Sequence, residues 1–141
     1  MHRTILPPGW KRPRGYANGM AARGELLAIA GQIGWDEGER LVSDGFAGQF
    51  RQALQNVVAV VGAAGGRAEH LISITIYVVD KREYEGALQD VGAAWREVIG
   101  RHYPAMALVE VQGLLEPGAR VEIQGLAVLP PVDPEPLPDV P

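Results

Sequence analysis

The sequence predicts an α+β fold, in which two helices pack on one face of a mixed β-sheet. The first observation is the order of elements, since the spacing of apolar residues indicates strands, a helix, a strand, a second helix and two final strands. The second is size, because 141 residues with 47% hydrophobic content suit one domain with a packed core. We therefore expect a single domain over residues 1–130 with both helices on one face of the sheet.

The first predicted element is a short buried strand. Residues 1–15 are irregular in composition, and no element is expected there. Residues 26–30 (Leu-Leu-Ala-Ile-Ala) form an apolar run that Gly31 closes, which is typical of a buried strand. The charged segment 35–40 then predicts a hairpin connection.

The clearest helix prediction begins at Phe46. Apolar residues recur from there at the spacing of one helical face until Gly65 and Gly66, which are suited to a C-terminal cap. Just before the helix, Ser43 and Asp44 offer side-chain oxygens of the kind that cap a helix N-terminus.

The second half of the chain predicts a strand, a helix and two more strands. Residues 71–79 are rich in β-branched side chains, which favours a strand. A helix is expected from about residue 82 to 99, and strands over 105–111 and 120–129. The apolar face predicted for this helix consists of Tyr84, Leu88, Val91, Trp95 and Val98.

Both ends of the chain predict segments outside the packed domain. Six of the last twelve residues are proline, so residues 131–141 are expected to form a disordered, proline-rich tail. The first sixteen residues lack the apolar segment of a secretory signal, and no uncharged run reaches the ~18 residues of a membrane span. We expect a soluble, cytoplasmic protein with no membrane partner.

The composition excludes several classes of function. The absence of cysteine excludes thiol nucleophiles and zinc–cysteine sites, and the three scattered histidines do not predict a metal site. The two serines have no nucleophile-elbow context. A net charge of -4 without an extended basic patch argues against nucleic-acid binding.

Glu122 is the carboxylate whose context is unusual, because it interrupts an apolar strand. Alternation places Arg120, Glu122 and Gln124 on one face, and Val121 and Ile123 on the other. The pattern alone is compatible with a solvated polar face of the sheet, which it favours, or with a general acid/base at a subunit cleft.

Eight short strings, spread in order through the domain, together resemble the RidA/YjgF family. They are GYANG (15–19), AGQI (30–33), QFRQALQNV (49–57), AAG (63–65), TIYVVD (75–80), YPA (103–105), VEV (109–111) and VEI (121–123). The resemblance implies a chorismate-mutase-like fold and a homotrimer with three clefts between subunits. It also implies hydrolysis of enamines and imines to a keto acid and ammonia, without a cofactor.

Carried over residue by residue, the resemblance implies site roles for three residues of this sequence. Tyr16 matches a cleft tyrosine, Gln32 lies in the Gly-Gln motif, and Glu122 matches the glutamate that handles the attacking water. Three residues depart from the family pattern: Ala30 stands in place of a serine, Leu108 in place of a small or thiol residue, and Met106 in place of the carboxylate-binding arginine.

The departures leave more than one function open. Methionine cannot pair with a carboxylate, so an aromatic or uncharged ligand is expected, contacted by Met106 and by Trp35 or Trp10. Arg14 or Arg120 is a candidate for a displaced cation. The first hypothesis is a hydrolytic deaminase of divergent specificity, and the alternative is a non-catalytic ligand-binding or regulatory trimer. The acidic charge disfavours a ribonuclease.

Overall fold

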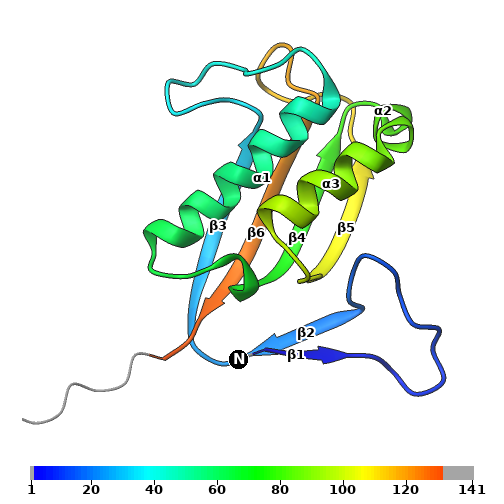
Figure 1. Cartoon of the computed structure of the whole chain (residues 1–141), viewed down its shortest axis with the longest axis vertical. Coiled ribbons are helices and arrows are strands. Elements are labelled where there is room, and N and C mark those ends of the chain that lie inside the picture. Colours follow the sequence, from blue (N-terminus) through cyan, green and yellow to red (C-terminus); the bar gives the residue numbers. More distant parts are fainter. Residues whose placement is uncertain (1, 132–141) are drawn as a thin grey trace, which may run out of the picture.

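The computed structural model describes residues 2–131, which form two sheets and two main helices (Figure 1). The strands are β1 (His2–Ile5), β2 (Gly19–Ala22), β3 (Glu25–Ile33), β4 (Leu71–Val78), β5 (Ala105–Glu110) and β6 (Val121–Leu129), and the helices are α1 (Phe46–Ala63), α2 (Lys81–Gly86) and α3 (Leu88–Val98). A short 3-10 turn, Ala68–His70, leads into β4. The predicted α+β class is confirmed.

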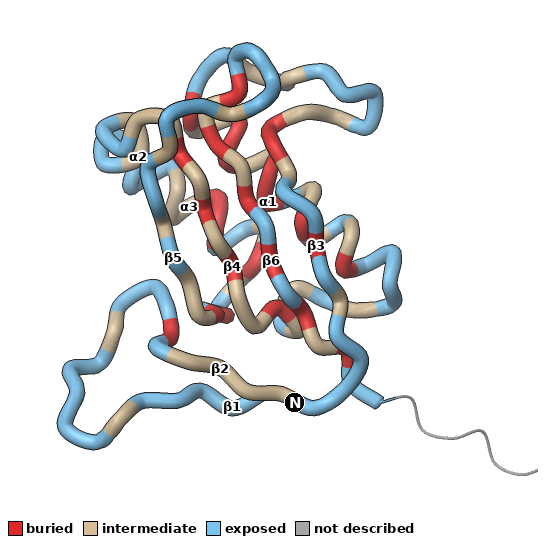
Figure 2. Tube along the Cα trace, turned by 180° about the vertical axis from the view of Figure 1, so that it is seen from behind, coloured by how far each residue is buried: buried red, intermediate tan, exposed pale blue. Residues whose placement is uncertain are grey.

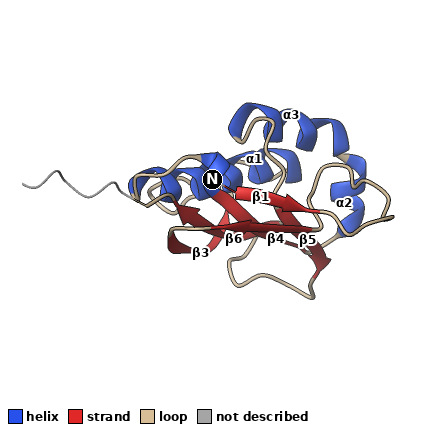
Figure 3. Cartoon of the chain, turned by 90° about the horizontal axis from the view of Figure 1, so that it is seen from below, coloured by secondary structure: helices blue, strands red, loops and turns tan. Residues whose placement is uncertain are grey.

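The larger sheet is mixed and is covered by helices on one side. Its strand order is β3-β6-β4-β5, with β4 and β5 parallel and the other two pairings antiparallel. The parallel pair requires a crossover, which α2 and α3 provide, and these helices and α1 lie on the same face of the sheet (Figure 3). The opposite face is open in this chain (Figure 2).

Helix α1 buries the apolar face that its sequence predicts, but it is capped differently. Phe50, Leu54 and Val57 are almost completely buried against the sheet. The left-handed φ of Gly65, 88°, ends the helix as predicted. The N-cap prediction was wrong, because Gly45 is the N-cap and the Ser43 hydroxyl accepts a hydrogen bond from the Gly45 amide. Ser43 thus stabilises the turn before the helix.

The second predicted helix is broken into two. Helix α2 ends at Gly86, where the Ala87 amide bonds to the Tyr84 carbonyl oxygen, and α3 begins at Leu88. Glycine has a weak helix propensity, so a break here costs little. As a result Leu88 is 56% exposed rather than packed in the core, while Trp95 is buried as predicted.

Residues 2–15 are more ordered than their composition suggests. β1 pairs with β2 to form an antiparallel hairpin that lies below the main sheet (Figure 1). All four residues of β1 are exposed, so the sequence carries no apolar alternation that could have predicted this strand. Gly24 joins the hairpin to β3 with a φ of 146°, and a Cβ there would meet the Leu129 carbonyl oxygen at 1.7 Å.

Two further predictions concerned a membrane span and the C-terminal tail. No helix within residues 2–131 has the length and apolar character that a membrane crossing needs. The predicted tail, residues 131–141, lies outside the described residues except for Pro131.

Candidate functional site

Glu122 lies on the open face of the sheet, directly over the backbone of Gly31. In β6 it faces away from the core, since its neighbours Val121 and Ile123 are fully buried on the helix side. A Cβ at Gly31 would come within 2.7 Å of the carboxyl carbon of Glu122. The alternation predicted for Glu122 and Gln124 is confirmed. Because Gly31 has no side chain, the Glu122 carboxylate can occupy the space above it.

A β-bulge in β3 creates this arrangement. Ala30 and Gly31 together lie opposite one residue of β6, because the register shifts between Ile29 and Gln32. Beyond the bulge Gln32 lies opposite Ile123, so it belongs to the helix-covered face and not to the face of Glu122. Its side-chain amide donates a hydrogen bond to the Ala30 carbonyl oxygen, which places Gln32 as a support of the bulge.

Asn56 of α1 fixes the end of β3. Its side-chain amide donates hydrogen bonds to the carbonyl oxygens of Ile33, at 3.0 Å, and Trp35, at 2.8 Å. Its carbonyl oxygen accepts one from Gln52. Sequence reasoning assigned no role to Asn56; the signal available was its place within the string shared with the family. Asn56 thus holds the segment from the bulge to Trp35 against the helix.

Met106 belongs to a second group of residues at the other edge of the sheet. Met106 and Leu108 pack against the core from β5, and with Tyr16 they line a hollow of about 250 Å³. Tyr16 reaches this edge because the next residue, Ala17, donates its amide to the Pro104 carbonyl oxygen. The structure therefore brings three of the predicted residues together: Tyr16, Met106 and Leu108.

The two groups do not meet within one chain. Met106 pairs with Ile74 of β4 and Glu122 with Tyr77, three residues further on, so their side chains lie on opposite faces. Two inter-strand spacings also separate β5 from β6, or roughly 10 Å. Trp35 follows β3 at the opposite edge of the sheet from Met106. A cleft that uses both groups needs a second copy of the chain.

The two candidate cations differ in what they contact. The Arg120 guanidinium donates to both carboxylate oxygens of Glu83, at 3.1 and 2.9 Å, and to the Asp44 carbonyl oxygen. It is therefore engaged near the helices and does not share the face of Glu122, contrary to the alternation prediction. Arg14 lines the hollow of Met106 and Tyr16, and within residues 2–131 it forms no ion pair.

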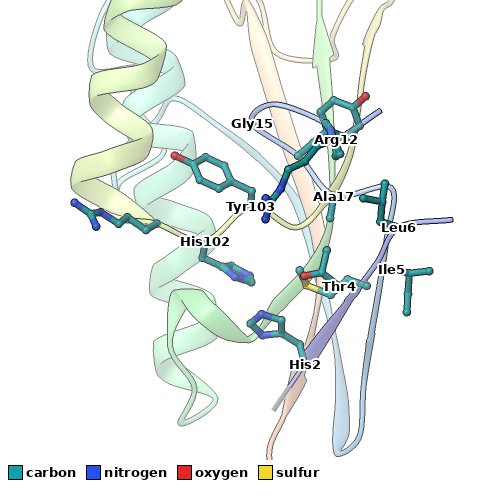
Figure 4. A pocket seen from close by; sticks show the side chains of 13 residues that line it. His2, Thr4, Ile5, Leu6, Arg12, Gly15, Ala17, His102 and Tyr103 are labelled. Atoms are coloured by element: carbon teal, nitrogen blue, oxygen red, sulfur yellow. The ribbon is translucent and has the colours of Figure 1, made fainter. Parts of the chain in front are cut away.

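Another hollow, of about 610 Å³, lies between the β1–β2 hairpin and the connection from α3 to β5 (Figure 4). His102 lines it and is held by a 2.6 Å hydrogen bond between its Nε2 and the Leu71 carbonyl oxygen. Burial lowers the pKa of His102, which favours the neutral form of the ring. Only Tyr16 of the predicted site residues lines this hollow. The described part of the chain contains no cluster of three or more potential metal ligands.

Comparison with known proteins finds one family. The sequence model of the endoribonuclease L-PSP family matches residues 11–129. A 2-iminobutanoate/2-iminopropanoate deaminase of Salmonella typhimurium is 31% identical over 108 residues, which are 74% of this chain and 80% of the relative.

Solved structures of similar proteins share the fold. A protein of unknown function of the conserved Rid family, YyfB from Yersinia pestis, is 26% identical and superimposes with a TM-score of 0.80, over 91% of this chain and 98% of that one. The YjgF gene product of E. coli is 29% identical with a TM-score of 0.66, over 89% and 98%. The fold is therefore the chorismate-mutase-like fold that the resemblance implied.

Proposed function

The chain belongs to the RidA/YjgF family, and we propose that it is a hydrolytic deaminase of enamines or imines, working in clefts between the subunits of a homotrimer. The observation that carries the proposal is the Glu122 carboxylate, seated over Gly31 at a bulge on an otherwise open sheet face. A carboxylate that lies beside a backbone without a side chain is suited to directing a water molecule.

The proposed reaction converts an imine and water into a carbonyl compound and ammonia. Glu122 accepts a proton from a water molecule while the water oxygen bonds to the imine carbon. The same proton then passes to the nitrogen, which gives a carbinolamine. Glu122 next accepts the hydroxyl proton and passes it to the nitrogen, so that the carbonyl group forms as the carbon–nitrogen bond breaks and ammonia leaves. An enamine enters the same route after a proton is added to its carbon.

The arrangement of one chain supports an inter-subunit site. Glu122 and the Met106 hollow lie on opposite faces of the sheet, so both can contribute to one cleft only if they come from different copies. The open face also exposes apolar side chains, including Leu126, which is 38% exposed on a central strand. We propose that this face is buried in the homotrimer, which is a common way to cover exposed apolar surface.

A second candidate function is ligand binding without catalysis. It is favoured by Met106 and Ala30, which supply neither the guanidinium nor the hydroxyl that the family pattern has at these positions. The two candidates share the cleft and differ in whether Glu122 takes part in chemistry.

Ammonia release from freshly generated imines separates the two candidates. The wild type is expected to accelerate hydrolysis of at least one imine in a panel, and Glu122→Gln to lose roughly 100-fold or more of that rate. Glu25→Gln, a change at an exposed carboxylate of the same sheet, is the matched control and should leave the rate unchanged. Absence of acceleration by the wild type would favour binding alone, and a Glu122→Gln variant as fast as an active wild type would show that Glu122 takes no part in the chemistry.

A further inference from the structure

Met106 stands between two hollows on the helix side of β5. The hollow that contains Arg14 and Tyr16 has a volume of about 250 Å³. A second hollow, of about 270 Å³, lies under α3. Both are lined by Met106, Ile76 and Tyr84, so the two hollows adjoin beside the methionine. Their combined size suits a small molecule larger than a three- or four-carbon acid.

The second hollow is apolar over most of its surface. Leu88, Val91 and Trp95 of α3 line it. The exposure of Leu88, which follows from the break between α2 and α3, leaves its side chain available at this hollow. Methionine at residue 106 is flexible and makes favourable contacts with aromatic rings. The hollow therefore suits a bulky apolar group.

The charge in both hollows is positive, which favours an anionic ligand. Arg14 lines the first hollow and Arg96 the second, and no carboxylate among residues 2–131 lines either. The guanidinium of Arg96 lies over Gly92, at 3.2 Å from where a Cβ would stand. Arg14 is on the side of Tyr16, next to the residue that replaces the usual arginine, and so offers a guanidinium from a different segment.

We propose that Arg14 binds the carboxylate of the substrate in place of an arginine at residue 106, and that the substrate is a 2-imino acid with a large apolar side chain. This inference rests on the proposed function and names its substrate class. The carboxylate pairs with Arg14 near Tyr16, and the side chain passes Met106 into the hollow under α3. An arginine at residue 106 would place a charge where the apolar side chain has to pass.

Binding of stable 2-keto acids, the products of such a reaction, tests the inference without requiring catalysis. By titration calorimetry, phenylpyruvate should bind the wild type at least ~10-fold more tightly than pyruvate, since it alone can fill the apolar hollow. Arg14→Gln should weaken phenylpyruvate binding by roughly 10- to 100-fold, the usual effect of losing a charged hydrogen bond. Arg14→Lys should recover part of the loss.

The matched control for the charge is Arg12→Gln, because Arg12 lines the neighbouring hollow and not that of Met106. It should bind phenylpyruvate as the wild type does. Equal loss in the Arg12 and Arg14 variants would indicate a general effect of positive charge and overturn the assignment. So would wild-type affinity in Arg14→Gln, or no phenylpyruvate binding by the wild type.

A steric variant tests the apolar hollow independently. Gly92→Leu adds a side chain into the hollow under α3, where its Cβ meets only the flexible end of Arg96. Phenylpyruvate binding should fall by ~10-fold or more, and pyruvate binding should change by less than about 3-fold. Gly62→Leu, a change in open space on α1, should change neither. Equal loss for both ligands in Gly92→Leu would show that the side chain does not occupy this hollow.

Ammonia release completes the test and separates this inference from the proposed function. If both are right, the imine of phenylalanine is hydrolysed faster than the imine of alanine, and Gly92→Leu reverses the order. If phenylpyruvate binds through Arg14 but no imine is hydrolysed, the ligand class stands and the deaminase proposal fails. If imines are hydrolysed with a preference for that of alanine, the deaminase stands and the substrate class is wrong.

Discussion

Gly31 sets the position of the proposed catalytic carboxylate by having no side chain. Because a Cβ would come within 2.7 Å of both the carboxyl carbon and Oε1 of Glu122, Gly31→Ala must push that carboxylate aside. We expect the kcat for imine hydrolysis to fall by roughly 100-fold, as for other misplaced catalytic groups, with little change in Tm. Gly62→Ala is the control, since a methyl group there meets no atom within 4 Å. An active Gly31→Ala variant would contradict the assigned role.

His102 gives the stability of the fold a pH dependence. Burial, with a smaller contribution from the nearby His2, lowers its pKa below the usual 6.5. As the pH falls through that value, the unfolded chain takes up a proton that the folded chain resists, so stability is present above about pH 6.5 and decreases below it. The Tm should therefore decrease as the pH is lowered from about 7.5 to 5.5.

The His102→Gln variant tests the origin of that change. Glutamine can donate the same hydrogen bond to the Leu71 carbonyl oxygen but does not titrate. Its Tm should depend less on pH over the same interval, even if its Tm at neutral pH is lower. An unchanged pH dependence would assign the effect to other groups.

At the scale of elements, Gln49 connects α1 with two loops. This fully buried side chain donates to the carbonyl oxygens of Ser43 and Gly118 and accepts from the Arg120 amide. Gln49→Met keeps the volume but leaves three partly buried backbone groups without these partners. We expect unfolding in denaturant to show a loss of about 2–4 kcal/mol, at roughly 1–3 kcal/mol for each unsatisfied group that does not rehydrate. Gln55→Met, on the exposed side of the same helix, should cost far less.

The same scale shows what the sequence can and cannot predict. The strands β4 and β6 and helix α1 were predicted well because one side of each is buried, which imposes a period of two or 3.6 on the sequence. Strand β1 is exposed along its length and carries no such period. The break between α2 and α3 depends on Gly86, and a single glycine does not reveal whether a helix continues through it.

The sequence predicts the face of the sheet correctly for one residue of the candidate site and not for another. The alternation of β6 correctly placed Glu122 on the open face. The face of the sheet on which Gln32 lies could not be predicted from alternation. The bulge at Ala30 and Gly31 shifts the register by one residue, so the residues of β3 after the bulge lie on the opposite face from the one that alternation gives. The proximity of Arg14 to Met106 depends on a long N-terminal loop, whose path only the tertiary structure gives.

At the scale of the whole molecule, the open sheet face predicts assembly. Leu126 lies on a central strand of that face, so Leu126→Lys would place a charge within the proposed interface. Light scattering coupled to gel filtration should give three times the 15.2 kDa chain mass for the wild type and a smaller mass for the variant. Leu115→Lys, at a fully exposed loop residue, should remain a trimer. A monomeric wild type would contradict the inter-subunit site.

The placement of Glu122 and Tyr16 on different faces has a genetic consequence. If each site takes its carboxylate from one subunit and its tyrosine from the next, two inactive alleles can complement each other. Co-expression of Glu122→Gln with Tyr16→Ala chains should restore about a quarter of the sites, because that fraction of randomly formed interfaces joins two unaltered halves. A site confined to one chain would show no recovery. By the same reasoning, when Glu122→Gln chains form trimers with wild-type chains, each variant chain inactivates one cleft, including a cleft whose tyrosine comes from a wild-type neighbour.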